Sequence, residues 1–196
     1  MMRAPKILLY LFISCLCFGC QSSLQRESRI EKQDDVYVLS FANLSFSVSA
    51  GKGGRIVSFK CEDRELLTSD SVHSKYYGAT FWLSPQSEYW PQYQCVDELP
   101  YQAEIDKQIL RLVSSPDSIS GVSVTKEFSI SERDSSILIH YSVRNVSRQL
   151  KRLAPWDVTR VYGGLSFFPV GETDWMNKSD VTGGYEDKGM VWVPCP

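Results

Sequence analysis

Apolar and polar residues alternate with a period of two through most of this sequence, and this pattern constrains the fold more than any other feature. The clearest run is 122–130, where apolar side chains occupy alternate positions and only Lys126 interrupts them. Similar runs at 44–50, 101–105 and 137–145 are separated by short polar turns. No stretch combines a sustained 3.6-residue period with helix caps. The pattern therefore predicts an all-β fold, an antiparallel β-sandwich of many short strands.

The N-terminal residues predict a secretory signal. Arg3 and Lys6 precede an apolar run at 7–18 that is only about a dozen residues long, whereas a membrane-spanning helix needs roughly 20. Gly19 followed by Cys20 resembles the end of a bacterial lipoprotein signal, in which the cysteine is acylated and becomes the mature N-terminus. We therefore expect a signal peptide at 1–19 and a lipid attached to Cys20.

The predicted lipid places the protein in the bacterial cell envelope, on the outer membrane or the periplasmic face. Residues 20–35 are mostly polar and charged, and we expect them to form a flexible tether between lipid and domain. The remaining residues, 36–196, are within the size range of one compact domain, which we expect to begin near Val36.

Charge and cysteine content exclude several classes of function. With 21 Lys and Arg against 23 Asp and Glu, and no basic cluster, nucleic-acid binding is not expected. The folded part keeps Cys61, Cys95 and Cys195, which allows either one disulfide, with Cys61–Cys95 preferred, or free buried thiols. These cysteines and the two histidines fit no zinc spacing, so we expect no metal and no cofactor.

One short stretch, 80–92, combines four large aromatic residues with an amide side chain, Gln86, between two prolines. Aromatic faces can stack on the apolar side of a sugar ring, while amide or guanidinium groups bind its hydroxyls. Large aromatics are also common core residues, so packing is the alternative interpretation. In the strand predicted at 150–162, Trp156 and Arg160 share one face and Asp157 lies on the other.

Three sequence blocks, at 54–56, 81–91 and 154–165, resemble an uncharacterised bacterial family with a galactose-mutarotase-like domain, related to the aldose epimerases. The resemblance implies a β-sandwich of the supersandwich type whose concave face binds carbohydrate. Aldose epimerases place histidines beside the sugar and a carboxylate base late in the chain, but this sequence has Trp156 and Asp157 where such a histidine would stand. The chain is also shorter than the full sandwich, so we expect an incomplete domain, truncated at its C-terminus.

The first hypothesis is a lipid-anchored envelope protein that binds a mono- or oligosaccharide. Its expected recognition residues are Arg55, Trp82, Gln86, Trp90, Trp156 and Arg160. For Arg160 the alternative is a cation–π contact that only stabilises the sandwich.

Two other functions are open at this stage. An epimerase or mutarotase needs a general acid and a general base beside the sugar, and the candidate is His140, on the more polar face of its strand. A lone strand histidine is more often solvated or structural. The other alternative is a structural envelope lipoprotein that binds no small molecule.

Overall fold

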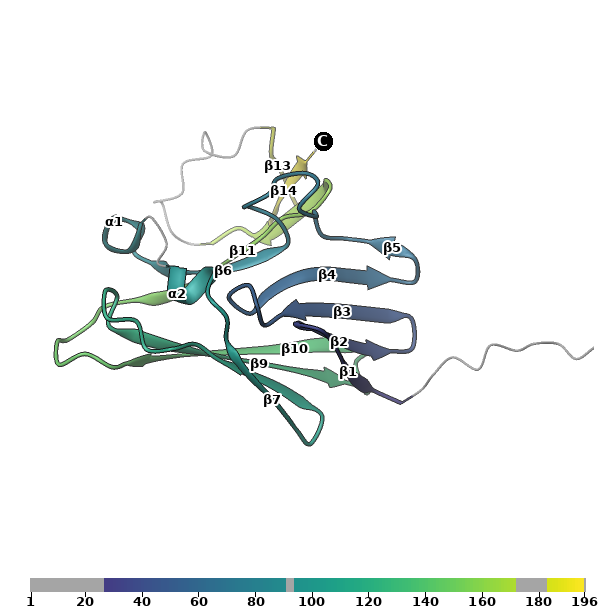
Figure 1. Ribbon diagram of the computed structural model, residues 1–196. Coiled ribbons are helices and arrows are strands. Elements are labelled where there is room, and N and C mark those ends of the chain that lie inside the picture. Colours follow the sequence, from purple (N-terminus) through teal and green to yellow (C-terminus); the bar gives the residue numbers. More distant parts are fainter. Residues whose placement is uncertain (1–26, 91–93, 172–182, 196) are drawn as a thin grey trace, which may run out of the picture.

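The computed structural model describes residues 27–90, 94–171 and 183–195, and within these residues the chain forms antiparallel β-sheets (Figure 1). The largest sheet has seven strands in the order β1-β2-β3-β4-β6-β11, with β5 paired to β4. Its strands are β1 (Arg29–Gln33), β2 (Val36–Phe41), β3 (Leu44–Ser49), β4 (Arg55–Cys61), β5 (Arg64–Glu65), β6 (Ala79–Ser84) and β11 (Ala154–Thr159).

The second sheet has four strands in the order β10-β9-β8-β7 and lies against the first. Its strands are β7 (Gln102–Asp106), β8 (Ile109–Val113), β9 (Val122–Ser131) and β10 (Ser136–Asn145). A third sheet, ordered β12-β14-β13, consists of β12 (Gly164–Pro169), β13 (Tyr185–Asp187) and β14 (Met190–Cys195). The predicted all-β sandwich is confirmed.

The hydrophobic core fills the space between the two larger sheets, because each sheet turns the apolar side of its alternating strands inward. Phe46 of β3 and Phe128 of β9 meet there, with ring centroids 5.7 Å apart. The largest fully buried apolar side chains are Phe81, Phe128, Leu39, Leu110, Leu112, Val48, Val96, Val122 and Val124. The period of two read from the sequence thus determines which residues form the core.

Two single-turn helices were not expected from the sequence: α1 (Gln86–Tyr89) and α2 (Gln94–Asp97). The first begins where Pro85 ends β6, and the Pro85 carbonyl accepts hydrogen bonds from the backbone N–H groups of Glu88 and Tyr89. Tyr89 is 5% exposed and joins the core, which fixes this turn against the sandwich. A helix this short is stabilised by such packing and not by its own propensity.

The folded part begins earlier than the expected Val36, so the predicted tether at 20–35 is partly wrong. β1 pairs with β2 through Gln33 and Val36, and Ile30 packs against the core. The connecting turn has Asp34 at φ 56°, a conformation that aspartate tolerates better than most residues. One half-buried side chain and a tight turn were enough to add a strand to a largely polar segment. The predicted signal at 1–19 and Cys20 lie outside the described residues.

The preferred Cys61–Cys95 disulfide is also wrong, since both thiols are free. β4 starts at Arg55 beside Asp97 of α2 and runs away from it to Cys61, a span of roughly 20 Å at 3.3 Å per residue. Cys61 and Cys95 therefore lie at opposite ends of the sheet. The Cys95 thiol is buried and donates a hydrogen bond to the Ser115 carbonyl.

Lys126, which interrupts the apolar run of β9, points into the core and is 1% exposed. Its ammonium group donates hydrogen bonds to the carbonyl oxygens of Gly53 (2.7 Å) and Gly54 (3.3 Å). It also lies 5.1 to 5.9 Å from three ring centroids, those of Phe81, Tyr101 and Tyr141. Burial lowers the pKa of Lys126 to about 7, partly offset by the charge of Asp97. Lys126 thus connects the four-stranded sheet to the glycine turn of the seven-stranded sheet.

No helix within the described residues is long and apolar enough to cross a membrane.

The glycine turn between β3 and β4 generates a first prediction. Gly53 has φ +62°, and a Cβ there would lie 2.1 Å from the Asp97 carbonyl oxygen. We expect Gly53→Ala to lower the free energy of unfolding by at least about 2 kcal/mol, from backbone strain plus this clash. The control is Gly189→Ala. Gly189 has φ +75°, but an added Cβ would meet no atom within 4 Å, so the free energy of unfolding should fall by only about 1 kcal/mol. If urea unfolding gives the same loss of stability for both variants, the close approach of Gly53 to the Asp97 backbone is contradicted.

Lys126 generates a prediction on pH. Its pKa is about 7 in the folded chain against 10.5 for an unperturbed lysine, so the unfolded chain binds more protons between these pH values. The contribution of Lys126 to the free energy of unfolding should therefore rise from about pH 7 to pH 9, by up to about 1.4 kcal/mol per pH unit.

Urea unfolding across this pH range checks the Lys126 prediction. The rise in stability should be smaller in Lys126→Met and unchanged in Lys60→Met, which removes an exposed lysine. The prediction fails if Lys126→Met and the parent chain respond to pH in the same way.

Candidate functional site

β6 is buried on both faces, which sets it apart from the other strands of its sheet. Phe81 and Leu83 point into the core, so Thr80 and Trp82 must point to the outer face of the seven-stranded sheet. β11 pairs with β6 in a register that places Trp156 directly opposite Trp82. Cross-strand partners lie on the same face of a sheet, so the two indoles meet outside the sandwich.

Four aromatic rings gather on this outer face, and we call them the tryptophan cluster: Tyr76, Trp82, Trp90 and Trp156. Trp82 is central, with ring centroids 5.4 Å from Trp90, 5.3 Å from Trp156 and 6.1 Å from Tyr76, all edge to face. Trp82 is only 6% exposed, whereas Trp90 is 46% exposed and Trp156 is half-buried. The rings available to a ligand are therefore Trp90 and Trp156, with Trp82 as their support.

Arg160 joins the tryptophan cluster through its guanidinium, which lies 5.4 Å from the Trp82 ring centroid and 5.5 Å from that of Tyr76. The same group donates hydrogen bonds to the Thr80 hydroxyl (3.0 Å) and the Val158 carbonyl (3.2 Å). Burial lowers its pKa, with the charge of Asp97 acting in the opposite direction. Arg160 thus makes the cation–π contact that was the alternative to direct sugar binding, and it orients the aromatic rings.

Arg55 and Asp97 form a buried ion pair beside the cluster, with 3.4 Å between Nη2 and Oδ2 and side chains 5% and 4% exposed. The Arg55 guanidinium also donates a 2.7 Å hydrogen bond to the Lys75 carbonyl. Burial raises the pKa of Asp97, and the Arg55 charge acts against it. The indole N–H of Trp82 further favours the charged carboxylate, without reaching hydrogen-bond geometry. The pair connects the start of β4 to α2.

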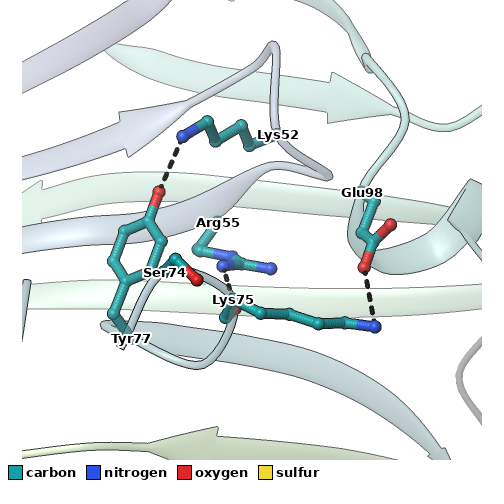
Figure 2. Close-up of a pocket in the computed structure, with 6 residues that line it drawn as sticks. All are labelled: Lys52, Arg55, Ser74, Lys75, Tyr77 and Glu98. Atoms are coloured by element: carbon teal, nitrogen blue, oxygen red, sulfur yellow. Dashed lines mark hydrogen bonds and ion pairs between the residues drawn. The ribbon is translucent and has the colours of Figure 1, made fainter. Parts of the chain in front are cut away.

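A pocket of about 270 Å³ lies beside this ion pair and is lined by Lys52, Arg55, Ser74, Lys75, Tyr77 and Glu98. Figure 2 shows Lys52 reaching Tyr77 on one side and Lys75 reaching Glu98 on the other, with the Arg55 guanidinium between them. We call it the cationic pocket, because three of its lining side chains are cationic and one is anionic.

The structure brings five of the six expected recognition residues to one region: Arg55, Trp82, Trp90, Trp156 and Arg160. The sixth, Gln86, is exposed at the start of α1, and its carbonyl accepts a hydrogen bond from the Trp90 N–H at 2.9 Å. One helical turn therefore separates Gln86 from the most exposed ring of the cluster.

The catalytic candidate His140 lies elsewhere. Its neighbour Tyr141 points into the sandwich, where its hydroxyl donates a 2.8 Å hydrogen bond to Asp157. His140 therefore faces outward from the four-stranded sheet, and its side chain is 72% exposed. Its Nδ1 lies 3.2 Å from Oε2 of Glu127. The two sheets separate His140 from the tryptophan cluster. No group of three or more potential metal ligands occurs within the described residues.

Sequence reasoning missed the loop residues Lys75, Tyr76 and Tyr77, as well as Lys52 and Asp97. The segment 68–75 is polar and irregular, and two tyrosines follow it shortly before β6. That pair of aromatics was the available signal. No sequence signal pointed to Asp97 or Lys52, because the contacts of Asp97 with Arg55 and of Lys52 with Tyr77 follow from long-range packing.

Comparison with known proteins adds no relative: no protein-family model, curated protein or solved structure matches this chain. The function must therefore be inferred from the geometry of the chain itself.

The buried ion pair generates a prediction on stability. Arg55→Met leaves the Asp97 carboxylate buried without its counter-charge, and we expect it to lower the free energy of unfolding by about 3–5 kcal/mol. The double variant Arg55→Met/Asp97→Leu should lose less than the sum of the single losses. Arg133→Met breaks an ion pair whose arginine side chain is 89% exposed, and should cost less than about 1 kcal/mol. Additive losses in chemical denaturation would argue against coupling between Arg55 and Asp97.

Proposed function

We propose that this protein binds carbohydrate on the outer face of its seven-stranded sheet, where the exposed rings of Trp90 and Trp156 stack on a sugar. The observation that carries the proposal is the position of Trp82. This buried indole supports both of the more exposed indoles at 5.3 to 5.4 Å. Rings fixed before a ligand arrives lose little conformational entropy on binding.

The polar groups around the cluster support the same proposal. Gln86 is exposed one turn before Trp90 and offers both a donor and an acceptor to sugar hydroxyls. Arg160 is committed to Thr80, Val158 and two rings, so its role is to position the aromatic side chains. Aromatic plates with a few well-placed polar groups are typical of small-molecule sites.

The proposal favours recognition over turnover, because the epimerase candidate His140 lies on the opposite side of the sandwich. We include in the proposal a galactose-mutarotase-like type of sandwich, a lipid on Cys20 and a place in the bacterial cell envelope. These parts are supported by the sequence resemblance, and Cys20 lies outside the described residues.

A binding experiment tests the proposal directly. The purified full chain is titrated with cellotriose, maltotriose, galactotriose and chitotriose, and binding is followed by calorimetry and by tryptophan fluorescence. At least one sugar should bind, and its affinity should fall about tenfold in Trp90→Ala and again in Trp156→Ala, since each ring contributes on the order of 1.4 kcal/mol.

The control for the binding experiment is Phe167→Ala, which removes an aromatic side chain that is 60% exposed on the third sheet. Its affinity should equal that of the parent chain. Unchanged affinity in both folded tryptophan variants would refute stacking at the cluster.

A further inference from the structure

The cationic pocket has a positively charged lining that stacking of a neutral sugar on the tryptophan cluster does not explain. Its lining combines Lys52, Arg55 and Lys75 with a single carboxylate, that of Glu98. The counter-charges nearby are few: Asp97 is buried behind Arg55, and Asp70 acts on Lys52 from a distance. The lining therefore carries an excess of positive charge on a surface where neutral sugars would need none.

The two lysines are positioned by contacts with other residues of the pocket lining. The Lys52 ammonium donates a 3.0 Å hydrogen bond to the Tyr77 hydroxyl, an interaction that raises the pKa of Lys52. The Lys75 ammonium lies 3.4 Å from a Glu98 carboxylate oxygen, with its side chain 56% exposed. Each ammonium group has further donors that remain available to a ligand.

Arg55 supplies the buried component of the pocket. Its guanidinium stacks on the Tyr77 ring at 4.9 Å, and its two terminal nitrogens bind the Lys75 carbonyl and Asp97. Its Nε is buried and has no hydrogen-bond partner among the described residues. Arg55 thus contributes a fixed, buried positive charge to the lining of the pocket.

Tyr76 connects the cationic pocket to the tryptophan cluster. The Lys75 ammonium lies 5.5 Å from the Tyr76 ring centroid, and the Arg160 guanidinium lies 5.5 Å from the same ring. Trp82 meets Tyr76 edge to face at 6.1 Å. Tyr76 therefore lies between the cationic pocket and Trp82, the ring that supports both Trp90 and Trp156.

We propose that the cationic pocket binds the negatively charged group of an acidic sugar, the carboxylate of a uronic acid or a sulfate ester, while the sugar ring occupies the neighbouring tryptophan cluster. This inference rests on the proposed carbohydrate-binding function and narrows its ligand class. The pocket volume of about 270 Å³ is close to the lower end of ligand sites and suits one charged substituent with part of a ring. Lysine and arginine groups bind such anionic oxygens through charge-assisted hydrogen bonds.

Two matched sugar series provide the test. The full chain is titrated at low salt with galactose, galacturonate and galactose 6-sulfate, and with glucose, glucuronate and glucose 6-sulfate. At least one acidic sugar should bind about tenfold more tightly than its neutral parent, and salt should reduce this advantage. Preference for the uronate identifies the carboxylate as the group bound, and preference for the sulfate identifies the ester.

Charge-matched variants locate the binding site. Lys52→Gln/Lys75→Gln should remove the preference for the acidic sugar over its neutral parent. Lys60→Gln/Lys107→Gln lowers the net charge equally at exposed positions outside the pocket and should keep the preference.

Three outcomes would overturn the inference. Equal binding of neutral and acidic sugars refutes the anion site but leaves carbohydrate binding intact. Acetate or inorganic sulfate binding as tightly as the acidic sugar shows that the ring contributes nothing. If no sugar of either series, and none of the neutral trisaccharides, binds the full chain, the proposed carbohydrate-binding function fails as well.

Discussion

The burial of one ammonium group, that of Lys126, is the interaction on which the arrangement of the rest depends. Its hydrogen bonds to Gly53 and Gly54 fix the turn between β3 and β4 against β9. That turn places Arg55 at the start of β4, where it meets Asp97 of α2. Replacing the Lys126 side chain with an apolar one would leave these two carbonyl groups without their donor inside the core. The position of the candidate site thus depends on a residue that takes no part in binding.

The site exists because β6 is buried on both of its faces, whereas β2 in the same sheet is fully buried on only one. Phe81 belongs to the core, while Trp82 on the other face needs its own cover, which Tyr76, Trp90 and Trp156 provide. The cluster is thus a second, smaller core outside the sandwich. It differs from a true core in that two of its rings remain partly open to solvent. Packing and recognition are therefore compatible roles for the same four side chains.

The sequence predicted the strands well, because a period of two reports directly which face of a strand is buried. It also placed Trp156 and Arg160 on one face, since that follows from alternation along β11. Alternation cannot show which strands pair. It therefore could not predict that Trp82 lies opposite Trp156 or that Arg55 contacts Asp97. The same limit explains the wrong disulfide. β1 was missed because its one core side chain, Ile30, lies in a mostly polar segment.

The two ligand-facing indoles differ from Trp82 in how easily their surroundings open. Trp156 lies on β11, which pairs only with β6 among the described strands, and Trp90 follows a helix of four residues. Short helices and edge strands undergo local opening at lower free energy than central strands, and amide hydrogen exchange reports such openings. A ligand that contacts both rings would stabilise only the closed state. Occupancy would therefore slow hydrogen exchange in β11 and α1 more than in the centre of the sheet.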